Sequence, residues 1–360
     1  MTQIEERRAM PGRTHRVVDS DSVRTNSRQL RDFVVPAVVI GAIGVVLAVV
    51  LWTAQSGVVD DAKLRNPAHP TAGPLHPLWN VSDWPFIFSL IFVGVAAALL
   101  FAFAWLSIRD RRVHHGLIVL AAVTILSGLD PFANWVTFTT FNPTFLHFPT
   151  SWAWISLAPL IEPVTNVPGY PMYYLGVALV AFALATYTRG RVNPDRWLGR
   201  HPLLTFFGVG LVVGVIWDIL TELFMMRAGM YFYSQSYGPN IHWGPVSYPV
   251  YWGFFTWSSI AVITVLLYRD DDGISVLHRF GRHLPGPETT PDSVSVLRRI
   301  IAGVLILCAS YAFCFALYGG FRIGHLDHAG YTGPWPYPST KVYDPQGVLQ
   351  HAGQVGPYYK

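Results

Sequence analysis

Two carboxylic acids, Asp218 and Glu222, lie one helical turn apart inside the apolar run 203–226. Gly210 and Gly214 precede them at the same spacing of four, so on a helix all four positions form one stripe. The glycines allow a neighbouring backbone to approach closely along that stripe. A carboxylic acid at the centre of a membrane helix costs roughly 2.5–3.5 kcal/mol on insertion scales, so two of them indicate a functional site.

Paired acids at low dielectric resist double ionisation, so one keeps its proton while the other is an anion near neutral pH. That division supplies a general acid and a general base. No lysine occurs in any of the long apolar runs to neutralise the acids. The alternative is a structural pair that bonds to Tyr, Trp or Arg227 and holds helices together. We predict that Asp218 and Glu222 are catalytic, and that Asp130 orients or shares the proton.

The segment that begins at Asp130 adds a second polar group near the end of the apolar run 116–135. Pro131 frees a backbone carbonyl in the turn before it, so Asp130 alternatively caps the helix that restarts there. The following connection, 136–171, is rich in aromatic residues and contains no Lys or Arg. Its aromatic residues either form an interfacial belt or belong to a lid whose rings stabilise a cationic intermediate. The residues predicted to bind substrate are Asn134, Trp152, Trp154, Glu162, Tyr170 and Trp217.

Other chemistries find little support in the sequence. His325, Asp327 and His328 are compatible with a metal ion, but they lie in a loop-like segment, and we expect no metal and no cofactor. Retinal binding needs a lysine in the last apolar run, 300–318, which contains none. No Gly-rich phosphate loop or nucleophile elbow is present. Cys308 and Cys314 match no disulfide scaffold or zinc motif.

The composition indicates a membrane protein that positions these groups on helices. Of 360 residues, 52% are hydrophobic and 13% charged, which excludes an ordinary soluble domain or a disordered chain. The net charge of +4 is unevenly placed, so it reflects membrane orientation and no nucleic-acid partner is expected. We predict an all-α polytopic membrane protein with seven transmembrane helices of about 20 residues each. The expected spans are 33–52, 84–108, 116–135, 172–187, 203–226, 248–268 and 300–318.

The distribution of basic residues predicts the orientation. The amino-terminal segment and the connections after the second, fourth and sixth spans carry 19 of the 25 Lys and Arg residues, and the other side carries 6. This places the amino end in the cytoplasm and the carboxyl end outside, in a multi-pass protein of the cell membrane. Residues 1–32 are then a disordered basic cytoplasmic tail, 33–318 the transmembrane domain, and 319–360 a Gly/Pro/Tyr-rich outer tail. The acids fall in the outer halves of their spans.

Four short proline motifs follow one another in the sequence: Asp130-Pro131 with Asn134, Asn142-Pro143, Glu162-Pro163 and Tyr170-Pro171. Taken with the carboxylate helix and the seven-span layout, they resemble the membrane spirocyclase family named for AveC of avermectin biosynthesis. The resemblance covers most of the chain from the second span to the outer tail. It implies a role in secondary metabolism, the closing of a dihydroxy ketone into a spiroketal, with a dehydration in some members.

The preferred hypothesis is a cofactor-independent, membrane-embedded cyclase or dehydratase acting on a lipophilic polyol, ketone or isoprenoid. Its partners would be that small molecule and membrane lipid, while the sequence leaves the oligomeric state open. The rival is a proton-coupled transporter or lipid-binding membrane protein that uses the same acids as a relay. Against it, no inverted repeat is evident and the acids gather at one side of the membrane. A structural subunit of a larger complex is a third possibility.

Overall fold

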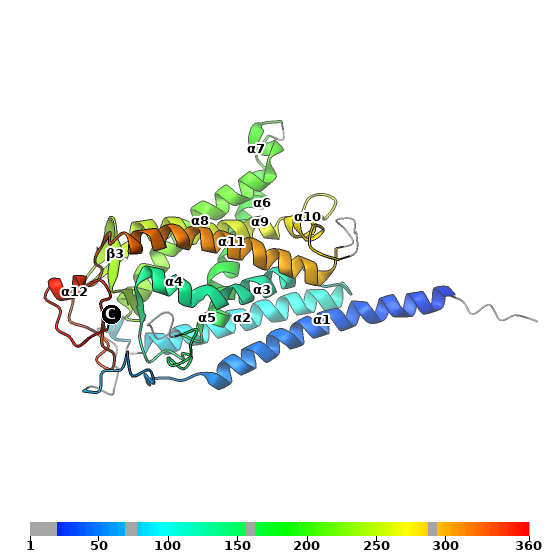
Figure 1. The fold of residues 1–360 in the computed structure, drawn as a ribbon. Helices are drawn as coiled ribbons and strands as arrows, with labels where there is room; N and C mark the ends of the chain where they lie inside the picture. The colour runs from blue at the N-terminus through cyan, green and yellow to red at the C-terminus, as the bar shows by residue number, and fades with distance from the viewer. Residues whose placement is uncertain are drawn as a thin grey trace, which may run out of the picture.

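The protein is an elongated bundle of long helices, with short strands gathered at one end. The computed structural model describes residues 20–68, 78–81, 83–155, 163–193, 195–286 and 294–359. The strands, helix α12 (Val348–His351) and the carboxyl terminus lie together at one end of the bundle (Figure 1). Helix α10 (Val276–Gly281) lies at the opposite end.

Five helical segments of the described residues are long and apolar enough to cross a membrane. They coincide with the second, third, fourth, fifth and seventh spans expected from the sequence. This identifies a helical membrane protein. The five are α2 (Trp84–Arg109), α3 with α4 (His115–Leu126, Asp130–Thr137), α5 through α6 (Asn166–Tyr170, Val177–Arg189), α8 (Pro202–Arg227) and α11 (Val296–Ile323).

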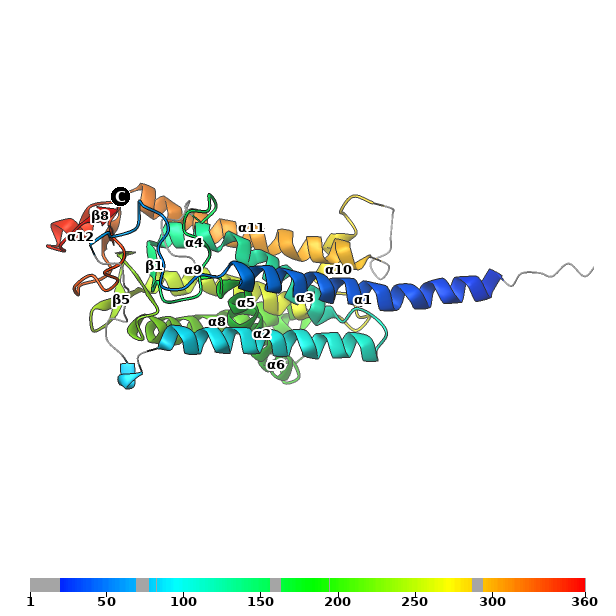
Figure 2. The same cartoon turned by 90° about the horizontal axis from the view of Figure 1, so that it is seen from below.

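The other two expected spans correspond to α1 (Ser20–Thr53) and α9 (Val250–Leu267). Neither is among the five candidate spans, so the total of seven remains a prediction. Helix α1 lies along α2 at the edge of the bundle (Figure 2). It begins at Ser20, within the segment expected to be a disordered tail, and residues 1–19 lie outside the described residues. Helix α9 is internal, with Ile260 and Ile263 at most 1% exposed.

The carboxylate stripe predicted from the sequence is the buried face of α8. Gly210, Gly214, Asp218 and Glu222 are all buried. A Cβ atom at Gly210 would lie 2.8 Å from the Cα of Ala261 in α9, so only glycine permits this approach of the two helices. The close contact between α8 and α9 turns the acids toward the centre of the bundle.

Among the described residues, eight short strands form four two-stranded sheets, so the expectation of an all-α protein is not confirmed. The strands are two to four residues long, too short for an alternating pattern to be recognised in the sequence. The residues of the expected outer tail take part in this layer: Tyr331, Tyr337 and Tyr343 are at most 2% exposed. The antiparallel pairs are β1 (Thr139–Phe141) with β2 (Tyr231–Tyr233), β3 (Gln235–Tyr237) with β6 (Asp327–Ala329) and β4 (Asn240–Trp243) with β5 (Val246–Pro249); β7 (Val342–Tyr343) and β8 (Tyr358–Tyr359) are parallel.

The predicted orientation can be tested with topology reporters. Because the basic residues lie on alternate connections, reporters on those connections should all report the cytoplasm, and reporters on the others should report the opposite side. The measurement is paired activity of a phosphatase and a fluorescent-protein fusion at each position. One reversed pair would contradict the orientation. The expected cytoplasmic positions follow Arg112, Arg191 and Arg282, and the expected outer positions follow Gly57, Gly238 and Gly347.

Candidate active site

The acids of α8 are held by tyrosines from the strands that follow this helix. Asp218 is 1% exposed and Glu222 is 8% exposed. The hydroxyl of Tyr248 in β5 donates a hydrogen bond of 2.5 Å to Asp218 Oδ2. The hydroxyl of Tyr233 in β2 donates a hydrogen bond of 2.6 Å to Glu222 Oε2. The chain therefore folds back over α8 and supplies each acid with a phenolic donor.

A third phenol joins the two acids into one network. Tyr173 belongs to a π-helical segment, Pro171–Gly176, between α5 and α6. Its hydroxyl donates to Glu222 Oε1 at 3.2 Å and, more weakly, to Asp218 Oδ1 at 3.4 Å. It also lies 2.9 Å from the Thr221 hydroxyl. A π-helical turn is wider than an α-helical one and is frequently found at functional sites.

Asp130 is the centre of a second polar cluster. Its carboxylate accepts hydrogen bonds from Asn134 at 3.0 Å, from the Tyr170 hydroxyl at 2.5 Å, and from the Asn166 side chain. The Tyr170 hydroxyl also lies 2.6 Å from that of Tyr311 in α11. Leu129, and not Asp130, is the residue at the N-cap of α4. These contacts favour membership of a polar site over the alternative role as a helix cap.

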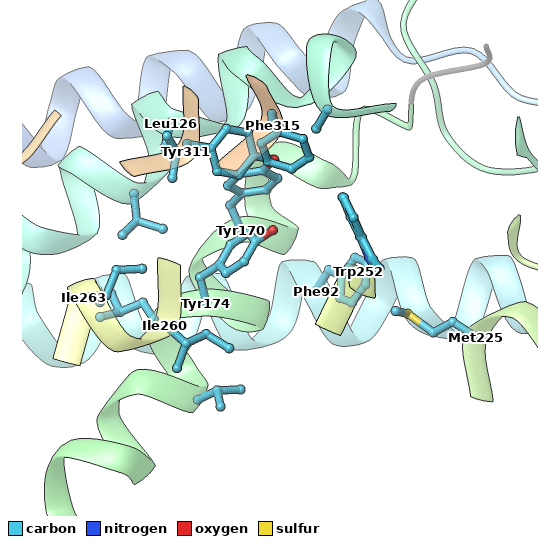
Figure 3. Close-up of a cluster of buried hydrophobic side chains, with 14 of the residues drawn as sticks. Phe92, Leu126, Tyr170, Tyr174, Met225, Trp252, Ile260, Ile263, Tyr311 and Phe315 are labelled. Atoms are coloured by element: carbon cyan, nitrogen blue, oxygen red, sulfur yellow. The ribbon is translucent and has the colours of Figure 1, made fainter. Parts of the chain in front are cut away.

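The two clusters open into one cavity of about 90 Å³. Glu222 lines it from α8 and Asp130 lines it from α4, whereas Asp218 is not among the described lining residues. Asp218 therefore lies behind Glu222. Figure 3 shows part of the aromatic and apolar wall, including Phe92, Tyr170, Met225, Trp252 and Tyr311. The remaining described lining residues are Ala133, Asn134, Thr139, Phe141, Phe145, Pro163, Asn166, Gly169, Tyr173, Tyr174, Met230, Tyr231 and Tyr233.

The tyrosines contributed by the strands remain hydrogen-bond donors at any physiological pH. Burial raises the pKa of Tyr233 well above its usual value, and a negative charge on Glu222 would raise it further. Burial raises the pKa of Tyr248 as well, and the negative charge of Asp218 raises that pKa further. Ionising either phenol would place a second negative charge beside a buried acid. Both phenols consequently stay protonated.

The structure brings four of the predicted site residues together around the cavity: Asp130, Asn134, Tyr170 and Glu222. Trp217 lies outside it and packs edge-to-face on Tyr173, with 6.1 Å between ring centroids. Trp152 and Trp154 lie at the surface. Glu162 lies outside the described residues.

Trp152 and Trp154 are 45% and 46% exposed, and neither is among the described residues that line the cavity. The Trp154 indole donates to the carbonyl of Gly128 at 2.9 Å. Trp152 stacks on Phe148 with 5.7 Å between ring centroids. Both rings thus have local surface partners, and the cavity is lined by aromatic residues from other elements.

Several residues at the site were not predicted. Tyr231 and Tyr233 both line the cavity, and their spacing of two places them on one face of strand β2. Asn166 lies four residues before Tyr170 on α5, which places both on one helix face beside Asp130. These spacings were available in the sequence, but in an aromatic-rich segment they are also typical of an interfacial belt.

Taken together, the fold and the site define a helical membrane protein with buried acids and phenols around a small internal cavity. The chain belongs to the AveC-like spirocyclase family, whose family model matches residues 109–343. The match confirms the resemblance found in the sequence and indicates a cyclase-type role. It includes every described residue that lines the cavity except Phe92. No curated protein and no solved structure matches the chain.

Proposed function

We propose that this protein closes a lipophilic dihydroxy ketone into a spiroketal by carboxylate acid–base catalysis at the cavity. The observation that carries the proposal is that Asp130 and Glu222 line the same cavity from different helices. Two carboxyl groups on one substrate site allow one to donate a proton while the other accepts one. Membership of the AveC-like spirocyclase family supports the same class of reaction.

The dehydration that closes the second ring requires two proton transfers. Addition of one substrate hydroxyl to the ketone forms a hemiketal without loss of atoms. A general acid then protonates the hemiketal hydroxyl, which leaves as water and produces an oxocarbenium ion. The second substrate hydroxyl attacks that carbon, and a general base accepts its proton, so the net change is loss of one water. Each proton transfer is work that a positioned carboxyl group performs.

We assign the acid to Glu222 and the base to Asp130. Asp218 and Glu222 lie one turn apart at low dielectric and share one proton more readily than they carry two charges. Glu222 is the member of this pair that lines the cavity, so it delivers the proton. Asp130 accepts hydrogen bonds from three side chains, which matches the acceptor-only bonding of an ionised carboxylate. Asp218 is a positioning residue that acts through Glu222.

The cavity wall also suits the charge that develops between these steps. The oxocarbenium ion is cationic, and aromatic ring faces attract cations. Phe92, Tyr174 and Trp252 line the same cavity from elements other than the two helices that carry the acids. Phenols that stay protonated, such as Tyr233, provide fixed dipoles without becoming competing bases. The wall therefore stabilises the intermediate while it limits side reactions with bulk water.

The test is conversion of a synthetic dihydroxy ketone that carries a long alkyl tail. The full-length protein is reconstituted in phosphatidylcholine vesicles, and product is followed by mass spectrometry and by the configuration of the spiro carbon. We expect dehydration to a single spiroketal configuration at a rate above that of empty vesicles. A rate equal to that of empty vesicles, or proton uptake into the vesicles without dehydration, would contradict the proposal. The second result is the one expected of a proton-coupled transporter.

A further inference from the structure

A second hollow, of about 510 Å³, lies on the outside of the helices next to the cavity. We call it the lateral groove. It is bordered by Val95 of α2, by Met172 and Gly176 of the π-helical segment, and by Val213 and Trp217 of α8. These residues belong to candidate membrane spans, so the groove faces the hydrocarbon region of a bilayer. The described residues that border it are apolar apart from the indole N–H of Trp217.

One short segment borders both the lateral groove and the cavity. In the π-helical segment Pro171–Gly176, Met172 and Gly176 line the groove, whereas Tyr173 and Tyr174 line the cavity. The ring of Tyr173 packs against Trp217, and its hydroxyl reaches Glu222. Tyr173 and Trp217 together therefore separate a lipid-facing groove from a catalytic acid.

The sizes of the two hollows show how a substrate must be divided between them. The cavity of about 90 Å³ is smaller than an apolar cavity of about 150 Å³, which admits a molecule the size of benzene. A dihydroxy ketone with enough carbons for two rings exceeds this space, and a hydrocarbon tail exceeds it further. The groove is several times larger and offers apolar walls, which are suited to hydrocarbon.

We propose that the lateral groove binds the hydrocarbon part of the substrate, and that Tyr173 swings aside to admit the ketone and hydroxyl groups to the cavity from the bilayer. This deepens the proposed function and rests on it. At the boundary, the Trp217 indole nitrogen is buried with no hydrogen-bond partner among the described residues. A ketone or hydroxyl oxygen of the entering substrate can accept a hydrogen bond from this indole N–H. The polar groups of the substrate thereby gain a hydrogen-bond donor as they leave the lipid.

The variant Gly176→Phe tests the lateral groove because the new ring fills the groove without a clash between its Cβ and neighbouring atoms. A Cβ at Gly176 meets only the carbonyl of Pro171, at 3.8 Å, and the backbone there is right-handed helical with φ −56° and ψ −46°. The matched control is Gly94→Phe. Gly94 is an exposed position of α2 outside the described groove lining, and no described atom lies within 4 Å of its Cβ position. Val213→Phe is a second filling variant in case Gly176→Phe does not fold.

The probe is the tailed dihydroxy ketone with a photoactivatable diazirine near the end of its tail, in phosphatidylcholine vesicles. In the wild type we expect photolabelling of peptides that contain residues 172–180 and 213–220. Filling the groove should reduce that labelling and lower kcat/KM for the tailed probe at least about tenfold, the lower end for altering the fit of an apolar pocket. A dihydroxy ketone without a tail should have the same kcat/KM in Gly176→Phe and Gly94→Phe. With the tailed probe, Gly94→Phe should match the wild type in both labelling and kcat/KM.

The outcomes separate this inference from the proposed reaction. Labelling outside the groove, or equal kcat/KM for the tailed probe in Gly176→Phe and Gly94→Phe, would overturn the groove while leaving the reaction intact. Groove labelling that is lost in Gly176→Phe, in a protein that does not dehydrate the probe, would support the groove and overturn the reaction.

Discussion

Replacing Glu222 with Gln is expected to lower kcat for the tailed dihydroxy ketone by at least about a hundredfold, the lower scale for general acid–base catalysis. The amide keeps the shape of the side chain and can still accept the hydrogen bond from Tyr233. Its NH₂ group is not acidic enough to protonate the departing hydroxyl. Removing a buried acid also relieves a desolvation cost, so the variant should fold at least as well as the wild type. The measurement is kcat, with Tm recorded on the same samples.

Asp218 provides an internal comparison for that result. Because it lies behind Glu222, Asp218→Asn should lower kcat less than Glu222→Gln does and leave KM unchanged. The double variant should be little worse than Glu222→Gln alone, since residues that act as one unit are not additive. Asp344→Asn is the matched control: Asp344 is 1% exposed and accepts a hydrogen bond from Gln235, outside the described cavity lining. Normal turnover by folded Glu222→Gln would remove Glu222 from the mechanism.

Replacing Asp130 with Asn is expected to cost a similar factor, at least about a hundredfold in kcat, because the cavity then lacks its base. Asp130 differs from Glu222 in one respect. Two of the three donors to its carboxylate are the amide NH₂ groups of Asn134 and Asn166, which cannot accept a hydrogen bond, so the new NH₂ must replace the oxygen that now accepts from the Tyr170 hydroxyl. That conflict should lower the free energy of unfolding by about 1–3 kcal/mol. The variant must therefore be assayed well below its Tm and normalised to folded protein.

Tyr170→Phe separates the two effects of the change at Asp130. It removes one donor to Asp130 and the contact with the Tyr311 hydroxyl, but it leaves the carboxylate in place. We expect a modest loss of stability and a much smaller loss of kcat than in Asp130→Asn. If Tyr170→Phe and Asp130→Asn lose the same activity, the cluster serves only to hold the helices, and the base lies elsewhere.

The sequence by itself determined the features that depend on local order along the chain. Five of the expected spans coincide with helices long and apolar enough to cross a membrane, because a long apolar run is recognisable residue by residue. The stripe from Gly210 to Glu222 is buried as predicted, since a spacing of four places residues on one helix face whatever surrounds the helix. The family was recognisable because its proline motifs are contiguous in sequence.

Only the tertiary structure decided which of these groups meet. Glu222 lines the cavity and Asp218 does not, although their positions in the stripe are equivalent, because the strands after α8 and the π-helical segment close over them differently. Asp130 reaches the same cavity, although it lies 92 positions before Glu222 in the sequence, because α4 and α8 pack around one centre. Trp152 and Trp154 lie at the surface, while aromatic side chains from other elements line the wall. Hydropathy and spacing report the face of a helix that is buried, but contacts between distant segments depend on how the helices and short strands pack together.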